Sequence, residues 1–261
     1  MDIHQIIDRT TLAAYFRQDI PLHLYSLGDL DDFYWPRTTY FGIQTKKTID
    51  KVTLLYRGEG LPVLLALSKP GLLDEVYLKQ LMSLLPVEFY GHLSPGLEKL
   101  FSGFYTIKAY GDHLKMALVE PVRLQYVNTE NTFLLTKEHL PEIKTLYEKS
   151  YPDNAFDPQM LNTGQYIGYQ DQDQLLSIAG VHVYSSIYRV AALGNVATHP
   201  NFRNQGLGKA VTAKLCQVLM NRVDFIGLNV KADNQSALSL YESLGFQIAD
   251  KYGEFSLKKR H

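Results

Sequence analysis

The sequence predicts a mixed α/β protein built from two domains, and three observations carry this prediction. The chain has 261 residues, which is enough for two small domains that each bury a core. Short runs rich in β-branched and aromatic residues alternate along the chain with segments of helical apolar spacing. A polar stretch at 125–131 interrupts the apolar pattern, so we place one domain at 1–125 and another at 126–261.

Composition and charge favour a folded protein without a polyanionic partner. Hydrophobic residues make up 46% of the chain and charged residues 20%, as in ordinary folded domains. The net charge of -1 provides no long-range field for nucleic acid or an anionic membrane, so neither is expected as a partner. The single Cys216 excludes an internal disulfide and a cysteine-built metal site, and no His-x-x-x-His spacing occurs, so no metal is expected.

The N-terminal segment carries charge before any apolar run. Asp2, Asp8 and Arg9 do not fit the basic-then-apolar pattern of a signal peptide. The apolar run at 61–67 is too short to span a bilayer and contains a proline. We therefore expect a cytoplasmic protein.

The first domain is expected to mix helices and strands, and it contains no chemical motif. Apolar spacing indicates a helix over 3–17, and a second helix at about 72–84 ends before Pro86. Extended segments are predicted at 22–27, 38–45, 51–57, 61–67, 87–90 and 104–118.

The second domain begins with a strand near Phe133 and a helix at about 137–149, for which Thr136 is a plausible N-cap. Strands are predicted at 165–170, 174–184 and 188–198, and the segment that begins at Phe225 reads as a strand followed by a turn. A further helix follows Asp233 or Asn234, either of which can cap it. Gly245 then supplies the left-handed residue that ends this helix before a strand at 246–249.

A glycine-rich segment lies between strand 188–198 and a helix with one apolar stripe. Gly206 and Gly208 stand at this strand-to-helix junction, where free N–H groups and the helix dipole favour an anion such as a pyrophosphate. Arg203 and Lys209 can add positive charge. The alternative is a glycine turn without a ligand.

This segment does not match the motifs of other phosphate-binding loops. A nucleotide P-loop requires Gly at the position of Arg203 and Ser or Thr at the position of Ala210. The dinucleotide pattern requires Gly or Ala at the position of Val211. Both nucleotide motifs are therefore excluded.

The segments at 203–208 and 234–246 together resemble the GNAT acetyltransferase superfamily. Its acyl-CoA loop has the pattern Arg/Gln-x-x-Gly-x-Gly/Ala, and its next unit reads Asn-x-x-Ala-x-x-Leu-Tyr-x-x-x-Gly-Phe; both stand here in full. The resemblance covers about 130–261. The sequence of residues 194–200 is similar to that of the branch that includes glycine N-acyltransferases. In that branch the N-terminal domain is often a degenerate copy of the same fold.

The resemblance implies a fold with a central mixed, splayed sheet and a site for acetyl-CoA or another acyl-CoA. The backbone of Val196, Ala197 and Thr198 would face the pantetheine arm, and Asn234 would lie beside the cofactor. The pyrophosphate would be held at the segment formed by Arg203, Asn204, Gln205, Gly206, Leu207, Gly208 and Lys209. Oxyanion stabilisation would come from a backbone N–H near 196–198.

Tyr241 would reach the sulfur of the cofactor and serve as general acid. A thiol has a pKa of about 8.5 and a tyrosine of about 10, so the hydroxyl can protonate a departing thiolate. An amine acceptor must lose a proton first, and His182 is a candidate base. The alternatives are a core tyrosine and a structural histidine, and His199 is expected to shape the loop.

The resemblance implies an N-acetyltransferase that moves acetyl to the primary amine of a small molecule or amino acid by direct attack. One alternative is a non-catalytic acyl-CoA-binding sensor or interaction protein. Another is a protein or peptide N-acetyltransferase. No motif indicates the acceptor, the acyl chain length or the oligomeric state.

Overall fold

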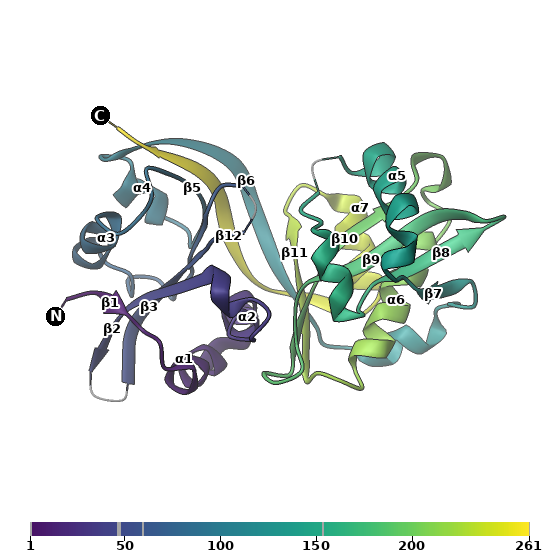
Figure 1. Cartoon of the computed structure of the whole chain (residues 1–261), viewed down its shortest axis with the longest axis horizontal. Helices are drawn as coiled ribbons and strands as arrows, with labels where there is room; N and C mark the ends of the chain where they lie inside the picture. Colours follow the sequence, from purple (N-terminus) through teal and green to yellow (C-terminus); the bar gives the residue numbers. More distant parts are fainter. Residues whose placement is uncertain (1, 46–47, 59, 153, 261) are drawn as a thin grey trace. The chain divides into compact units, whose positions relative to one another are not determined.

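The computed structural model describes residues 2–45, 48–58, 60–152 and 154–260, which form two compact units (Figure 1). The N-terminal unit consists of Met1–Lys115, Lys231–Asp233 and Ala249–His261. The C-terminal unit consists of Met116–Val230 and Asn234–Ile248. The last segment of the chain thus belongs to the N-terminal unit. The domain division expected near residue 125 stays a prediction.

The N-terminal unit holds a mixed sheet in the order β1-β2-β3-β4-β5-β12-β6. Strands β1 to β4 pair antiparallel in succession, β4 pairs parallel with β5, and β12 pairs antiparallel with β5. Its strands are β1 (His4–Gln5), β2 (Thr38–Thr45), β3 (Thr48–Tyr56), β4 (Val63–Ala66), β5 (Glu88–Leu93), β6 (Tyr105–Leu118) and β12 (Phe246–Lys259). Its helices are α1 (Arg9–Phe16), α2 (Ile20–Gly28), α3 (Glu75–Met82) and α4 (Leu97–Phe101).

Within the C-terminal unit the strands follow the order β11-β10-β9-β8-β7. Strands β7 to β10 pair antiparallel in succession, and β10 pairs parallel with β11. The strands are β7 (Thr132–Leu134), β8 (Ile167–Asp171), β9 (Gln174–Ser185), β10 (Val190–Thr198) and β11 (Phe225–Lys231). The α-helices are α5 (Leu140–Ser150), α6 (Leu207–Leu219) and α7 (Gln235–Ser243). The predicted mixed α/β class is confirmed.

The two units share one order of elements. Each has a strand, a helical segment, three antiparallel strands, a helix, a strand parallel to the third of those and a further helix. In the N-terminal unit the parallel pair is β4 and β5, and in the C-terminal unit it is β10 and β11.

Local capping chemistry explains several boundaries in the C-terminal unit. Thr136 begins the 3₁₀ turn Lys137–His139 that leads into α5, and its side chain accepts a hydrogen bond from Glu138 N. Asn234 caps α7 by accepting from Ala237 N at 3.1 Å. Gly245 has φ +96°, which favours glycine, and an added Cβ would lie 2.3 Å from the Glu120 carbonyl oxygen. The predicted caps are confirmed.

Two predictions for the N-terminal unit are wrong. The segment 22–27, expected to be a strand, lies in helix α2. The Asp19 side chain caps this helix by accepting a hydrogen bond from Leu22 N, and Pro21 lies in its first turn. This helix is buried on most sides, so its apolar pattern carries no helical period. The expected helix over 3–17 is β1 followed by α1, because the Asp8 side chain caps a helix that starts only at Arg9.

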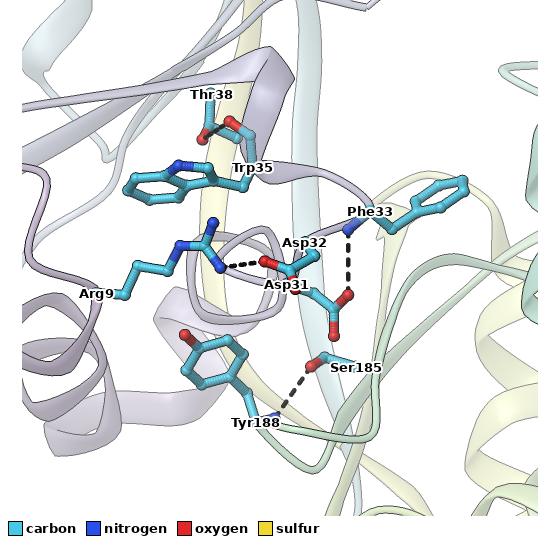
Figure 2. A network of polar contacts seen from close by, with 8 residues as sticks. All are labelled: Arg9, Asp31, Asp32, Phe33, Trp35, Thr38, Ser185 and Tyr188. Atoms are coloured by element: carbon cyan, nitrogen blue, oxygen red, sulfur yellow. Dashed lines mark hydrogen bonds and ion pairs between the residues drawn. The ribbon is translucent and has the colours of Figure 1, made fainter.

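Trp35 lies against Arg9 in the N-terminal unit (Figure 2). Its ring stacks on Tyr40 at a centroid distance of 5.6 Å, and the Arg9 guanidinium lies 4.3 Å from the indole centroid. The same guanidinium forms an ion pair with Asp32. No helix in the described ranges is long and apolar enough to cross a membrane.

Candidate functional site

The two parallel strands of the C-terminal unit separate near the middle of β10. Strand β10 pairs with β11 from Val190 to Leu193. Its last residues, Ala197 and Thr198, pair with β9, after a register shift that follows Gly194. Asn195 in this bulge has φ +55°, a left-handed conformation. The sheet is thus splayed where the sequence predicted it, and the backbone around Val196 is turned out of the regular ladder.

The glycine-rich segment follows β10 and opens helix α6. Gly206 has φ +82° and is the residue before the helix, which begins at Leu207. No side chain of the described residues caps this helix, in contrast to α7, which Asn234 caps. The first N–H groups of a helix have no partner within it, so those of Leu207, Gly208 and Lys209 are oriented for an anionic ligand.

The glycines also bring this segment close to its neighbours. A Cβ added to Gly206 would meet no atom within 4 Å, so a ligand can approach the backbone there. A Cβ added to Gly208 would lie 3.2 Å from Thr198 Oγ1 and 3.3 Å from Leu240 Cδ1. The start of α6, the end of β10 and helix α7 therefore meet at one place.

The Arg203 guanidinium is directed at backbone carbonyls. It donates to Thr198 O at 3.4 Å and to Ser150 O at 3.2 Å. Arg203 therefore ties the loop to the ends of β10 and α5 while its positive charge stays exposed. Asn204 has φ +61°, and Gln205 and Lys209 help to line a surface pocket of about 380 Å³ beside the loop.

Tyr241 lies on the buried side of α7. Its side chain is 9% exposed, and its ring contacts Phe246 edge to face at a centroid distance of 5.8 Å. Burial raises the pKa of Tyr241, with smaller contributions from nearby Cys216 and Tyr151. The hydroxyl is therefore protonated at neutral pH, as a proton donor must be. Cys216 itself is fully buried.

His182 lies on β9 against the backbone of β10. A Cβ added to Gly194 would lie 2.3 Å from Cδ2 of the His182 ring, so the imidazole occupies the space above this glycine. Its Nε2 is 3.1 Å from Oδ1 of Asn195. His199 has a different role, since its ring accepts from Asn201 N at 3.4 Å and packs edge to face on Phe202 at the entrance to the loop.

Asn195, which contacts His182, and two tyrosines bonded to Asn195 were not predicted from the sequence. Asn195 is 3% exposed, and its amide donates to the Tyr166 hydroxyl at 3.0 Å. The Tyr147 hydroxyl donates to the Asn195 carbonyl oxygen at 2.8 Å. Burial raises the pKa of both tyrosines, so both remain protonated. The available signal was a glycine within each of two adjacent strands, which indicates a close approach of side chains to the backbone.

The arrangement combines an anion site at the start of α6, a strand end with exposed backbone groups, a protonated tyrosine and a histidine. This set suits transfer of an acyl group from a phosphate-containing thioester to a nucleophile without a covalent enzyme intermediate. Among residues whose positions are described, no group of three or more His, Cys, Asp or Glu side chains is placed to hold a metal ion.

Comparisons with known proteins concern mainly the C-terminal unit. The family model described as "Acetyltransferase (GNAT) family" matches residues 132–246. The [ribosomal protein bS18]-alanine N-acetyltransferase of Escherichia coli K12 is 45% identical over 60 residues, which are 23% of this chain and 40% of that protein. The mycothiol acetyltransferase of Renibacterium salmoninarum is 31% identical over 111 residues, which are 41% of this chain and 30% of that protein. The chain thus matches less than half the length of these curated relatives.

One solved structure resembles the chain over nearly its whole length. It is a GNAT-family acetyltransferase from Colwellia psychrerythraea, with a TM-score of 0.61 and 17% identity over 99% of this chain and 100% of that one. This likeness concerns the fold. The family match identifies residues 132–246 as a domain of the GNAT acetyltransferase family.

Proposed function

We propose that the chain is an acyl-CoA-dependent N-acyltransferase that moves acetyl from acetyl-CoA to the primary amine of a small molecule or amino acid. The observation that carries the proposal is the uncapped, glycine-flanked start of α6 directly after a strand that separates from its parallel neighbour. One such helix start would attract any phosphate. The strand end beside it, which lies beyond the pairing of β10 with β11 at Val190–Leu193, would in addition offer backbone groups to the amide-containing pantetheine arm.

The cofactor would lie along β10 and over the loop. Backbone groups of Val196, Ala197 and Thr198 would bond the pantetheine arm. The N–H groups of 204–209 would hold the pyrophosphate, with the exposed Arg203 and the half-buried Lys209 nearby. Asn234 would lie beside the cofactor, where its side chain already orders the start of α7.

Transfer proceeds by direct attack of the amine on the thioester carbonyl. A backbone N–H near Val196 stabilises the oxyanion, since the bulge turns this part of β10 out of the ladder. Tyr241 donates a proton to the departing thiolate. His182 takes a proton from the protonated acceptor amine, whose pKa resembles the ~10.4 of a lysine side chain.

The N-terminal unit is, in this proposal, a degenerate copy of the same fold. Its order of elements supports this, and two differences explain the loss of cofactor binding. Helix α3, the counterpart of α6, is capped by the Asp74 carboxylate, which accepts from Tyr77 N at 2.9 Å and would repel a phosphate. Strand β4 pairs with β5 along its whole length, from Val63 to Ala66, so the sheet does not separate there.

The two relatives are named for molecules of different kinds, one for an alanine of a ribosomal protein and the other for mycothiol. A protein or peptide N-acetyltransferase is therefore the second candidate function. A third is an acyl-CoA sensor without turnover. The protonated, buried Tyr241 favours a catalyst over a sensor.

The decisive experiment incubates the full chain with acetyl-CoA and a panel of small amines, amino acids and N-terminal peptides, and measures free thiol. Thiol release that requires a small amine supports the proposal, and release only with peptides supports the second candidate. Saturable acyl-CoA binding without acceptor-dependent release indicates a sensor. If calorimetry detects no binding of acyl-CoA, the proposal is wrong. A series of longer acyl donors defines the acyl chain.

A further inference from the structure

A side chain of α5 bonds the main chain at the bulge of β10. In the pairing with β9, Asn195 and Val196 together stand against one residue of the neighbouring strand. The Tyr147 hydroxyl donates to the main-chain carbonyl oxygen of Asn195 at 2.8 Å. Asn195 is 3% exposed, and loss of a hydrogen bond to a buried carbonyl is costly, so this bond favours one orientation of the peptide between Asn195 and Val196.

Tyr147 is itself firmly held. Its side chain is buried, and its ring packs against Phe156 at a centroid distance of 5.2 Å. Burial raises the pKa of Tyr147, so the hydroxyl keeps its proton at neutral pH. A phenol has one O–H group, which is used for the Asn195 carbonyl. Tyr147 is therefore a fixed donor to this peptide.

The side chain of Asn195 completes a hydrogen-bond network at the bulge. Its amide donates to the Tyr166 hydroxyl at 3.0 Å, and its Oδ1 lies 3.1 Å from Nε2 of His182. Asn195 has φ +55°, a left-handed conformation that asparagine tolerates better than most residues. The residue is thus held through its main chain and its side chain at the point where β10 leaves the regular ladder.

The two faces of the strand pair β9 and β10 can be told apart by their side chains. Ser177 and Thr198 are opposite each other, and their hydroxyl oxygens are 2.8 Å apart. A Cβ added to Gly208 would lie 3.2 Å from Thr198 Oγ1, so this pair is on the face of α6. Gly180 follows Ser177 by three positions along β9 and therefore belongs to the other face.

Tyr147 lies on this other face. The Tyr166 ring fills the space over Gly180, where an added Cβ would lie 2.0 Å from Cε1 of the ring. The Phe156 ring contacts both Tyr166, at a centroid distance of 5.6 Å, and Tyr147. The Tyr147 hydroxyl therefore approaches β10 from the side of the sheet opposite to α6 and its glycine-flanked start.

The geometry of a peptide unit links this bond to the proposed cofactor site. The peptide between Asn195 and Val196 is trans, and a trans peptide directs its N–H opposite to its C=O. Because the Asn195 carbonyl is held toward Tyr147, the Val196 N–H is directed to the side of α6. A hydrogen bond to the carbonyl also polarises the peptide and strengthens its N–H as a donor.

We propose that Tyr147 is a positioning residue for the transfer, whose hydroxyl holds and polarises the 195–196 peptide so that the Val196 N–H meets the oxyanion of the thioester. As the amine nitrogen forms the C–N bond, the carbonyl electron pair moves onto oxygen, and its return expels the thiolate. Tyr147 gives up no proton and touches none of the reacting atoms. The inference rests on the proposed function for the oxyanion, whereas the orientation of the peptide is independent of it.

NMR of the full chain tests the orientation directly. Asparagine precedes valine only at 195–196 and 229–230. Isotope labels in the carbonyl carbon of asparagine and the nitrogen of valine therefore select these peptides, and loss of a signal in Asn229→Gln assigns them. In the protein without ligand, Tyr147→Phe should shift the carbonyl and amide signals of 195–196 and leave those of 229–230, an internal control, nearly unchanged.

Ligands and kinetics test the role in transfer. Acetyl-CoA should shift the Val196 amide signal more than CoA does, because only acetyl-CoA carries the carbonyl, and this difference should shrink in Tyr147→Phe. The same variant should lower kcat in the thiol-release assay by about 10–10²-fold, with unchanged affinity for CoA. Tyr77→Phe is the matched control, since the buried Tyr77 hydroxyl donates to the main-chain carbonyl of Phe41 at 2.9 Å in the N-terminal unit. It should lose similar stability and keep the wild-type kcat.

An unchanged 195–196 signal in Tyr147→Phe, or a kcat no lower than that of Tyr77→Phe, overturns the inference. A purely structural Tyr147 would give that second result, with a loss of stability alone. If neither CoA nor acetyl-CoA changes any signal, the proposed function fails. The response of the ligand-free 195–196 signal to Tyr147→Phe still decides whether Tyr147 orients this peptide.

Discussion

Gly180 and Gly194 lie directly opposite each other on the antiparallel strands β9 and β10. A Cβ added at Gly180 would lie 2.0 Å from Cε1 of Tyr166, and one added at Gly194 would lie 2.3 Å from Cδ2 of His182. These distances are far below a van der Waals contact, so each ring fills the space that a side chain would take. The facing glycines thus place the phenol and the imidazole on either side of Asn195.

Gly194→Ala is expected to displace the His182 ring and to lower the transfer rate, while acyl-CoA affinity changes little because the cofactor loop is untouched. The clash with a packed ring should cost about 1–3 kcal/mol of unfolding free energy. Urea unfolding, calorimetry with CoA and thiol release measure the three quantities. Gly103→Ala is the matched control, since its added Cβ meets no atom within 4 Å. An unchanged rate and stability in Gly194→Ala would contradict the prediction.

Gly206→Asp is expected to weaken CoA binding by about tenfold or more, because a carboxylate before α6 repels the pyrophosphate and can cap the free N–H groups. This substitution reproduces at α6 the situation of Asp74 at α3. Gly206→Asn is the matched control, since Asn and Asp tolerate the left-handed backbone of φ +82° about equally and differ in charge. Equal CoA affinities for the two variants would place the pyrophosphate elsewhere.

Tyr241→Phe should retain CoA affinity and lower kcat by about 10²-fold or more, because the ring stays and the proton donor is lost. Burial raises the pKa of Tyr241 above its usual 10.0, so the donor form persists at every pH below that value. The wild-type kcat should therefore not fall through donor ionisation up to about pH 10. Tyr110→Phe, at a tyrosine that is 40% exposed, is the control. A wild-type kcat in Tyr241→Phe would make Tyr241 a core residue.

The parts of the site that depend on neighbouring residues in the sequence could be predicted from it. The start of α6 at Leu207 and the cap of α7 at Asn234 follow from glycine and asparagine chemistry within a few positions. The splayed sheet was expected only through the resemblance at 203–208 and 234–246. The roles assigned to the cofactor loop and to Tyr241 stay predictions.

The network at Asn195 could not be predicted, because its partners are distant in the chain. Tyr147 and Tyr166 precede Asn195 by 48 and 29 positions, and no local pattern relates them. The prediction of a strand at 22–27 was wrong for another reason. This segment is helix α2, and because the helix is buried on most sides, its apolar residues lack the helical period on which the assignment depends. Both features therefore depend on contacts that form only in the folded protein.

Glu254 of β12 lies at the centre of a polar cluster in the N-terminal unit. Tyr252 donates to its Oε1 at 2.9 Å, Tyr90 donates to its Oε2, and Nε2 of both His92 and His113 lies 3.5 Å from Oε1. Burial alone would raise the pKa of Glu254, but the two histidines and the two hydroxyls outweigh it, and the pKa is lowered below 4.5. The carboxylate is therefore ionised at neutral pH.

Glu254→Gln is expected to reduce the free energy of unfolding at neutral pH by about 1–3 kcal/mol, because a half-buried group loses charge-assisted hydrogen bonds. The folded-state pKa is depressed, so this contribution is complete above pH 4.5 and is lost as the pH falls through the folded-state pKa. Urea unfolding at a series of pH values should therefore show the wild-type advantage shrinking below pH 4.5. Glu148→Gln, on the exposed side of α5, is the control and should show no such difference. A wild-type advantage that persists unchanged into acid would mean that shape, and not charge, makes Glu254 stabilising.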